Sequence, residues 1–362
     1  MAYTTIDDPS EYFTTLLYTG NATDNRNLTN DANAGDFQPD WIWLKERSST
    51  SSHQLMDSTR GSTPAVFSDS YSLEDDDANR LQAFQSNGFQ VGTASTVNQD
   101  GITMVAWQWK CNGGTTSTND ASSTGVGSID SVIQVNTDAG FSIVTYTGTG
   151  SNGTVAHGLG AAPDLVLVKN RSANDHWASH WQSTLGNTNS LRLNTTIAYT
   201  DSNGAGYWND TSATSTTVSV GSRVETNQSN KNYIMYCFKN IQGYSKIGSY
   251  VGNGTGANSA ADGPFVYTGF KPAWVMAKSS TVTQGWNIFD NKRTPTNEMG
   301  AFLQADDSGA ETTGYDSMDF LSNGFKLRKN LNGANDSGQT YVYMAFAESP
   351  FVSSNGVPTT AR

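Results

Sequence analysis

The pattern of apolar and polar residues repeats three times along the chain. A Tyr-x-Gly-x turn begins at Tyr18, Tyr146 and Tyr250, and a Pro-x-(four apolar)-Lys block ends 23 to 28 residues after each of these tyrosines. The blocks are residues 39–45, 163–169 and 272–278. Four consecutive apolar residues are too few for a helix, and a Pro at a strand entry costs no ladder hydrogen bond. Each block therefore predicts a strand that is buried on both faces.

Each unit also ends on an alternating aromatic segment, which begins 60 to 65 residues after the Lys of its block. These closing segments are residues 105–109, 234–238 and 342–346. Large side chains at every second position have the period of a strand. Aromatic-rich strands are also expected at residues 53–57, 177–181 and 286–290, between the block and the closing segment.

Turn chemistry distinguishes the second unit from the other two. An Asn-Gly pair between apolar segments occurs at residues 84–89 and 320–325, where it predicts a hairpin with a type I′ turn. The second unit has residues 217–221 instead, so its hairpin is expected to be shorter or built differently. Helical periodicity is nearly absent, and only residues 75–84 suggest one or two helical turns.

These signals predict an all-β protein of three repeated antiparallel units, each resembling a β-sandwich of the lectin or jelly-roll kind. The expected units are residues 1–111, 140–240 and 241–349. A linker rich in Ser, Thr, Gly and Asn is expected at residues 112–139, and an extended tail at 350–362.

Composition supports the strand prediction and excludes several partners. The 362 residues include 43 Thr, 41 Ser and 33 Asn, and such residues favour strands and turns over helices. The net charge is −12, so broad binding to nucleic acid or to an anionic membrane is not expected. No apolar run is long enough to span a bilayer, and no secretory signal precedes the first unit.

Motifs for catalysis and metal binding are missing from the sequence. No phosphate-binding loop, zinc-protease motif or nucleophile elbow occurs, so no catalytic residue and no cofactor is predicted. His176 and His180 would lie on one face of a strand but too far apart to share a metal, and no metal site is predicted. Cys111 and Cys237 belong to different units at non-equivalent positions, and we expect them to be unbonded.

One loop suggests binding chemistry. Tyr207, Trp208, Asn209 and Asp210 place two aromatic rings beside polar side chains in a Gly-rich segment, a composition that suits stacking on a sugar ring. They are the candidate carbohydrate-binding residues, and the alternative is a loop folded back onto its own core. Since 33 acidic residues are available, a glycoside hydrolase with paired carboxylates is a further alternative.

Several longer blocks resemble a family of virion structural proteins from marine tailed bacteriophages. They are Tyr3-Thr-Thr-Ile-Asp-Asp-Pro-Ser-Glu-Tyr-Phe13, Val155-Ala-His-Gly-Leu-Gly160, and residues 262–270, 320–327 and 343–351. The resemblance covers essentially the whole chain. It implies a non-enzymatic component of the particle that is associated with the tail or its fibres and contributes to host adhesion. It carries no catalytic residues over to this sequence.

Two other functions are kept as alternatives: a decoration or surface appendage of the capsid, and a depolymerase of surface polysaccharide. The expected location is the virion, after assembly in the host cytoplasm. The expected partners are other virion proteins, further copies of the chain, with a trimer favoured, and a host surface glycan. Strand edges that need partners support the oligomer.

Overall fold

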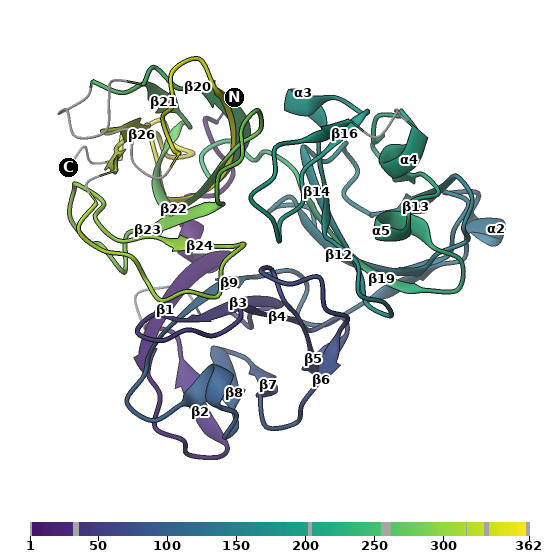
Figure 1. The fold of residues 1–362 in the computed structure, drawn as a ribbon, viewed down its shortest axis with the longest axis horizontal. Helices are drawn as coiled ribbons and strands as arrows, with labels where there is room; N and C mark the ends of the chain where they lie inside the picture. Colours follow the sequence, from purple (N-terminus) through teal and green to yellow (C-terminus); the bar gives the residue numbers. More distant parts are fainter. Residues whose placement is uncertain are drawn as a thin grey trace.

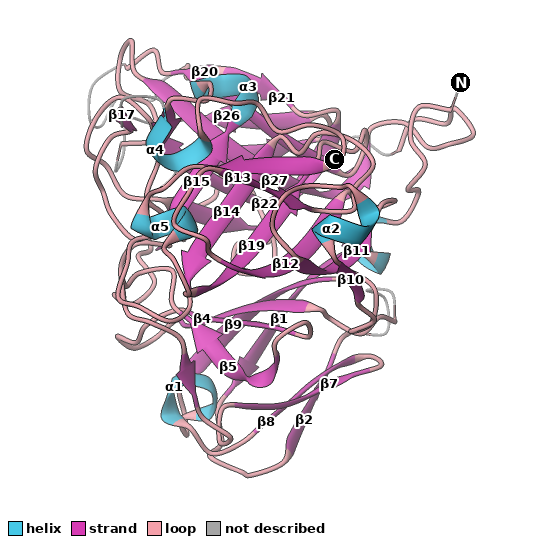
Figure 2. Cartoon of the chain, turned by 90° about the vertical axis from the view of Figure 1, so that its right-hand side faces the viewer, coloured by secondary structure: helices cyan, strands magenta, loops and turns pink. Residues whose placement is uncertain are grey.

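Antiparallel strands form almost all of the regular structure (Figure 2). The computed structural model describes residues 2–31, 36–201, 205–254, 262–315, 317–328 and 333–359. Within these residues the helices are short: η1 (Pro9–Glu11), α1 (Ser95–Asn98), α2 (Ala121–Thr124), α3 (Gln182–Leu185), α4 (Ala205–Trp208) and α5 (Val224–Asn227). The all-β prediction is confirmed.

Three lobes surround a common centre (Figure 1), and each is built on one large sheet. The first lobe contains β1 (Phe13–Thr19), β2 (Arg26–Thr29), β3 (Trp41–Glu46), β4 (Gln54–Asp57), β5 (Gly61–Val66), β6 (Asp75–Asp76), β7 (Leu81–Gln85), β8 (Gly88–Val91) and β9 (Thr103–Trp109). Its large sheet has the order β1-β9-β3-β4-β5-β6, and its small sheet has the order β2-β8-β7.

The second lobe contains β10 (Ser117–Asn119), β11 (Ser131–Asn136), β12 (Phe141–Thr147), β13 (Gly153–Ala156), β14 (Leu165–Asn170), β15 (Ala178–Trp181), β16 (Asn189–Ser190), β17 (Thr200–Asp201), β18 (Thr217–Val220) and β19 (Asn232–Phe238). Its large sheet has the order β10-β11-β12-β19-β14-β15. Two small sheets, β13-β18 and β16-β17, accompany it.

The third lobe contains β20 (Ser245–Val251), β21 (Phe265–Tyr267), β22 (Phe270–Ser279), β23 (Asn287–Asp290), β24 (Leu303–Gln304), β25 (Met318–Leu321), β26 (Gly324–Leu327) and β27 (Thr340–Pro350). Its large sheet has the order β20-β27-β22-β23-β24, and its small sheet has the order β21-β26-β25.

One order of four strands occurs in all three large sheets. The closing strand lies between the strand of the Tyr-x-Gly turn and the strand of the apolar block, and the aromatic-rich strand follows: β1-β9-β3-β4, β12-β19-β14-β15 and β20-β27-β22-β23. The register agrees as well, because Trp41, Leu165 and Trp274 each pair with a residue of the closing strand and with the last residue of the next strand. This recurrence supports the predicted three units, whose superposition stays a prediction.

The apolar blocks are buried on both faces, as predicted, because two separate cores cover them. Trp41 and Trp43 of β3 face the centre of the molecule, whereas Ile42 and Leu44 face the small sheet of the first lobe. The other two lobes repeat this division, and each has an apolar cluster of its own between large and small sheet. Each lobe is therefore sandwich-like.

The central core is the apolar cluster shared by the three large sheets. All nine tryptophans of the chain are at most 1% exposed, and all except Trp208 belong to this core. Within it, Trp41 packs on Trp109 of its own sheet and on Tyr236 of the second lobe. Burial of this much aromatic surface is the main force that holds the lobes together.

The Tyr-x-Gly turns are explained by a buried asparagine that the sequence did not reveal. In the first lobe Tyr18 donates its hydroxyl to the carbonyl of Val97 at 2.6 Å, and Asn98 Oδ1 accepts the backbone N–H of Asn21 at 3.1 Å. A side chain at Gly20 would place its Cβ 2.0 Å from the carbonyl oxygen of Gln99. Glycine is required here because the two backbones touch.

The same contacts occur in the other lobes. Tyr146 donates to the carbonyl of Thr226, and Asn227 accepts the N–H of Thr149 at 2.7 Å. Tyr250 donates to the carbonyl of Ala334, and Asn335 accepts the N–H of Asn253 at 3.0 Å. We call these three sets the Tyr–Asn clamps.

Two local predictions are wrong. The expected linker 112–139 contains β10, α2 and β11, and β11 pairs with β12 along its whole length. Its Ser- and Thr-rich composition suits an edge strand as well as a linker. Residues 75–84 are not helical, because they contribute β6 and the start of β7 instead.

The two Asn-Gly hairpins exist, but their turns differ from the prediction. Gln85 pairs with Gly88, so Ser86 and Asn87 form the loop, and neither has a positive φ. A type I′ turn needs two positive φ angles, and here Gly88 alone has one, at 119°. In the second lobe β18 pairs with β13 without a tight hairpin, as the different sequence suggested.

The predicted tail folds back on the start of the chain. Pro350 is the last residue of β27, and Asp7 accepts hydrogen bonds from the backbone and side chain of Ser354. Residues 360–362 of the predicted tail lie outside the described residues.

Candidate functional site

The predicted sugar-stacking residues Tyr207 and Trp208 are both fully buried in the second lobe. Trp208 stacks on His180, with ring centroids 4.8 Å apart, and the guanidinium of Arg223 lies over the Tyr207 ring. The prediction of a sugar platform is therefore wrong for these two residues, because neither ring offers a face to a ligand. The alternative, a loop folded onto its own core, describes them.

Asn209 and Asp210 lie at the surface next to these rings. Both have left-handed backbone, with φ of 51° and 47°, and they end the turn after α4. Asn209 Oδ1 accepts a hydrogen bond from Asn152. Without an aromatic face beside them, these two residues make no sugar site of the predicted kind.

The histidines and cysteines have structural surroundings. Burial lowers the pKa of His180 to about 4 and that of His53 to about 3, so both are neutral at physiological pH. Cys111 and Cys237 are free and buried, which confirms that they are not bonded to each other. Among the residues that the structure describes, no group of three or more His, Cys, Asp or Glu could hold a metal ion.

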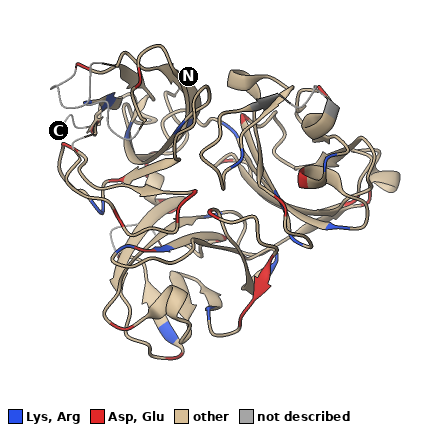
Figure 3. Ribbon diagram, in the orientation of Figure 1, with Lys and Arg blue, Asp and Glu red and all other residues tan. Residues whose placement is uncertain are grey.

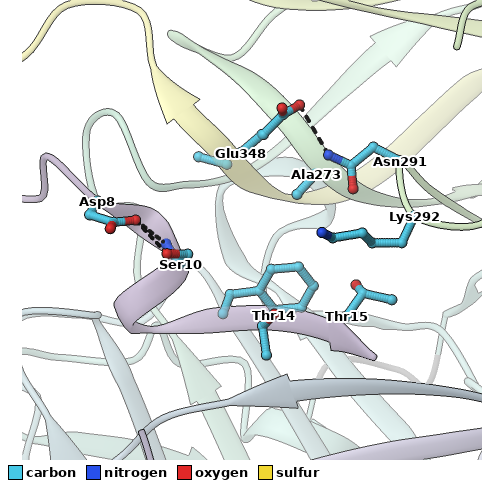
Figure 4. Close-up of a pocket in the computed structure, with 10 residues that line it drawn as sticks. Asp8, Ser10, Thr14, Thr15, Ala273, Asn291, Lys292 and Glu348 are labelled. Carbon is cyan, nitrogen blue, oxygen red and sulfur yellow. Dashed lines mark hydrogen bonds between the residues drawn. The ribbon is translucent and has the colours of Figure 1, made fainter. Parts of the chain in front are cut away.

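A pocket with binding chemistry lies elsewhere, between the start of the chain and the third lobe. We call it the N-terminal pocket, and its cavity is about 270 Å³. One wall comes from η1 and β1, and the other comes from β22, β27 and the turn after β23 (Figure 4). Its lining residues are Asp8, Ser10, Phe13, Thr14, Thr15, Ala273, Asn291, Lys292, Ala347 and Glu348.

The floor of the N-terminal pocket is apolar and rigid. Phe13 is 3% exposed, stacks on Phe346 with centroids 5.3 Å apart, and also packs on Trp109. Ala273 and Ala347 contribute to the opposite wall. Because Phe13 belongs to the central core, the floor is fixed by the packing of the whole molecule.

Two carboxylates face the pocket, and both are held in place by hydrogen bonds. Asp8 caps η1 and accepts bonds from the backbone and hydroxyl of Ser10, at 2.9 and 2.5 Å. Glu348 accepts bonds from Lys271 at 2.7 Å and from Asn291 at 3.0 Å. Both carboxylates therefore act as hydrogen-bond acceptors toward protein groups.

Two polar groups in the pocket are not engaged in this way. Within the described residues Lys292 forms no ion pair, and the hydroxyl of Thr15 has no hydrogen-bond partner although the residue is only 8% exposed. Figure 4 shows the Lys292 ammonium directed toward the pocket. The Thr15 hydroxyl oxygen has almost no accessible surface, so it is not offered to a ligand in the pocket. The pocket therefore presents one ammonium donor beside two hydrogen-bonded carboxylates.

Sequence reasoning missed this pocket because its residues come from opposite ends of the chain. Asp8-Pro-Ser-Glu has the residue types of a helix start, with an acidic cap followed by Pro, and this signal was available. The pairing of η1 with residues 291–292 and 347–348 depends on tertiary packing, which no local pattern reveals.

Comparison with protein families identifies a family for this chain. No curated protein matches the chain, and no helix in the described part of the structure is long and apolar enough to cross a membrane. A family model described as a domain of unknown function, DUF7483, matches residues 8–350. Because the match takes in nearly the whole chain and includes strands of all three lobes, this protein belongs to the DUF7483 family.

Proposed function

We propose that this protein is a non-enzymatic structural component of a tailed-bacteriophage particle, associated with the tail or its fibres and contributing to adhesion to the host surface. The resemblance of residues 3–13, 155–160 and 343–351 to virion proteins supports the location. An adhesin must keep its shape outside a cell, and a central core with eight of the nine tryptophans suits that need without disulfides.

The observation that carries the binding role is the N-terminal pocket, whose polar groups are placed for recognition. A glycosidase uses a pair of carboxyl groups that act directly on the glycosidic bond. Here Asp8 is hydrogen-bonded to Ser10, and Glu348 is bonded to Lys271 and Asn291. Because both carboxyl groups are already engaged with protein partners, the pocket favours binding over the alternative of a depolymerase.

An oligomer on the particle surface is part of the proposal, with a trimer favoured. The support is β21, an edge strand of its small sheet, on which Phe265 is 45% exposed and Tyr267 is 54% exposed. An edge strand with exposed aromatic side chains is suited to contact another chain. Charged residues are scattered over all three lobes (Figure 3).

The test is to locate the protein in purified particles by mass spectrometry and then by electron cryomicroscopy. We expect it in the particle, in density at the tail. Its absence from purified particles that contain the known capsid and tail proteins would contradict the proposal. Light scattering at micromolar concentration tests the oligomer separately, and a monomer would remove that part alone.

A further inference from the structure

We infer that the third lobe accepts an extended segment of a different protein as an added β-strand. The site is the open side of this lobe, which we define as the outer edges of β20 and β21 (Figure 1). The inference refines the contact proposed above for β21, and it rests on the proposed function only for the source of the segment, another protein of the particle. Its structural basis is a comparison with the second lobe, where the equivalent side is closed.

In the second lobe one segment of the chain, residues 128–136, closes this side. Ser128 and Ile129 donate their backbone N–H groups to the carbonyl of Thr154 on β13, at 2.9 and 3.1 Å. The segment continues as β11, which pairs with β12 along its whole length. Ile129 and Ile133 belong to the apolar cluster between the two sheets. The closing segment therefore joins an edge of the large sheet to an edge of the small sheet and covers the core between them.

The third lobe has the same two edges but is not given a closing segment by the chain that leads into it. β20 and β12 are the strands of the Tyr-x-Gly turns, and β21 and β13 follow them as edges of the small sheets. Residues 110–140 connect β9 to β12 and include the closing segment. Only residues 239–244 connect β19 to β20. This connection is too short to supply a strand.

The outer edges of β20 and β21 present unpaired backbone groups. In an antiparallel pair, alternate residues direct their N–H and C=O groups toward the neighbouring strand and away from it. Gly252 donates to the carbonyl of Gln339 beside β27, and Thr268 donates to that of Asn323 beside β26, which fixes the alternation. Within the described part of the chain, no hydrogen bond reaches the backbone groups that point outward, those of Ser249, Val251, Phe265 and Tyr267.

Apolar side chains are exposed along both edges. Val251 is 57% exposed, and Phe265 and Tyr267 are exposed to a similar degree. Tyr250 and Val266 belong to one apolar cluster, so the two edges border the same core. Unpaired backbone beside exposed apolar side chains is suited to strand addition, in which main-chain hydrogen bonds give affinity and alternate side chains give specificity.

The first lobe protects the equivalent edges with polar groups. The guanidinium of Arg26 on β2 donates to the carbonyl of Thr19, at the end of β1, at 2.7 Å. The exposed side chains of β2 are those of Asn27 and Thr29. An open apolar side therefore distinguishes the third lobe from both of the others.

The occupant is a segment of a different protein rather than a second copy of this chain. Every strand in the described residues is already paired in a sheet of its own copy, and Ser354 of the final segment is bonded to Asp7. A second copy offers only another edge, whereas closure of this side takes a free segment that reaches both sheets. Ile129 and Ile133 share one face of the closing segment, so the occupant should carry apolar residues at alternating positions.

The probe is a fluorescent synthetic peptide of residues 127–137, which contains the closing segment of the second lobe. We titrate the purified full-length protein into it and follow the anisotropy. We expect a Kd below about 1 mM, because main-chain pairing depends little on sequence. The control peptide has Pro in place of Val132 and Gln134, whose N–H groups face β12 in the second lobe. It should bind at least about 10-fold more weakly.

Two variants of the protein assign the binding to the open side. Val251→Lys and Phe265→Lys each place a charge on one edge, a device by which natural edge strands resist pairing. Each should weaken binding of the peptide by about 5-fold or more. The melting temperature should not change, because both side chains are exposed. Ile197→Lys is the matched control, since Ile197 is as exposed as Phe265 but lies in the second lobe, and it should keep the wild-type affinity.

The inference is overturned if the peptide fails to bind at about 1 mM, if the Pro-containing peptide binds equally well, or if both edge variants bind like the wild type. It is also overturned if the wild type self-associates and Phe265→Lys makes it monomeric, because a second copy then occupies the edge. These outcomes do not depend on the particle experiment. Absence from particles would remove the proposed source of the segment but not the binding, and failed binding would leave the location in the particle unaffected.

Discussion

The contact between the first and second lobes differs in kind from the contact between the second and third. Asp57, at the end of β4, and Arg60 form a fully buried ion pair at 2.6 Å, and Tyr236 of the second lobe donates to the same carboxylate at 2.7 Å. Arg60 also pairs with Glu74, which in turn pairs with Arg171 of the second lobe. We call this chain of contacts an ionic staple.

A second ionic staple joins the third lobe to the first. Asp290, at the end of β23, pairs with Arg293, and both side chains are fully buried. Trp107 of the first lobe donates to Asp290 at 3.0 Å. Arg293 also pairs with Glu311, which pairs with Arg47 of the first lobe. Both staples therefore contain an Asp at the end of the aromatic-rich strand, an Arg three residues later, a Glu, and an Arg from the neighbouring lobe.

The contact between the second and third lobes has no ionic staple at the corresponding positions. Trp181 occupies the register position of Asp57 and Asp290, and Met344 occupies that of Tyr236 and Trp107. Trp181 stacks on Trp286 of the third lobe, whose indole N–H donates to the carbonyl of Arg192. The second and third lobes are thus held by apolar packing and backbone hydrogen bonds.

This difference suggests that the staples specify which lobes are neighbours, while apolar burial supplies stability. A buried ion pair gains little overall, because desolvation offsets its attraction, but it penalises any arrangement in which one partner is left unpaired. The contact between the second and third lobes needs no buried ion pair, because the two ionic staples already fix the order of the lobes.

Removal of one staple carboxylate should have the largest effect. We expect Asp290→Ala and Asp57→Ala each to lower the free energy of unfolding by about 3–5 kcal/mol, because Arg293 or Arg60 is left buried and unpaired. Urea denaturation measures this. The control is Asp75→Ala, whose partner Arg80 is also buried but whose own side chain is 59% exposed, and a loss below about 1 kcal/mol is expected there. Equal losses of stability in the three variants would contradict the special role of the two buried ion pairs.

Replacing the glycine of each Tyr–Asn clamp by alanine tests a contact that all three lobes share, unlike the ionic staples. A Cβ at Gly20, Gly148 or Gly252 would lie 2.0 to 2.3 Å from a backbone oxygen. We expect each substitution to cost about 1–3 kcal/mol, the range for overpacking, whether or not the lobe has a staple. In the control Gly309→Ala the nearest atom belongs to the flexible side chain of Asp307, so the cost should be small. Strongly unequal losses would argue against three equivalent units.

Repetition explains how much of this fold the sequence could reveal. The blocks around Trp41, Leu165 and Trp274 gave correct strands because their apolar runs have a local cause. The buried Asn98, Asn227 and Asn335 were missed, since an asparagine in an Asn-rich chain carries no signal until its partners are known. The spacing Asp-x-x-Arg, by contrast, occurs at Asp57 and Asp290 and was readable. The rings of Tyr207 and Trp208 were wrongly predicted to be exposed, because composition does not tell which way a loop folds.

Acid should weaken the first staple. Burial raises the pKa of Glu74, but bonds from Arg171 and Arg60 outweigh it and hold that pKa below its usual value. A carboxylate with a lowered folded-state pKa contributes stability above its unfolded pKa and loses it as pH falls through the folded value. We therefore expect wild-type stability to fall more steeply below pH 4.5 than that of Glu74→Gln. Parallel pH curves for the two proteins would show that Glu74 contributes nothing.

The buried lysines of the apolar blocks should have the smallest effect on stability. Because each lobe has such a lysine, the effect should be common to all three lobes. Lys45, Lys169 and Lys278 are at most 1% exposed, and burial lowers the pKa of each to about 8, while nearby acids such as Asp175 and Asp306 only partly oppose the shift. The unfolded chain then binds more protons than the folded one above pH 8, so stability rises with pH in this window. For one lysine the gain from pH 7.5 to 9 is about 1 kcal/mol.

Lys278→Met should flatten that rise by this amount, whereas Lys246→Met on β20 of the same sheet should keep the wild-type slope. If the slope of Lys278→Met equals that of the wild type, the lysine is not titrating in this range.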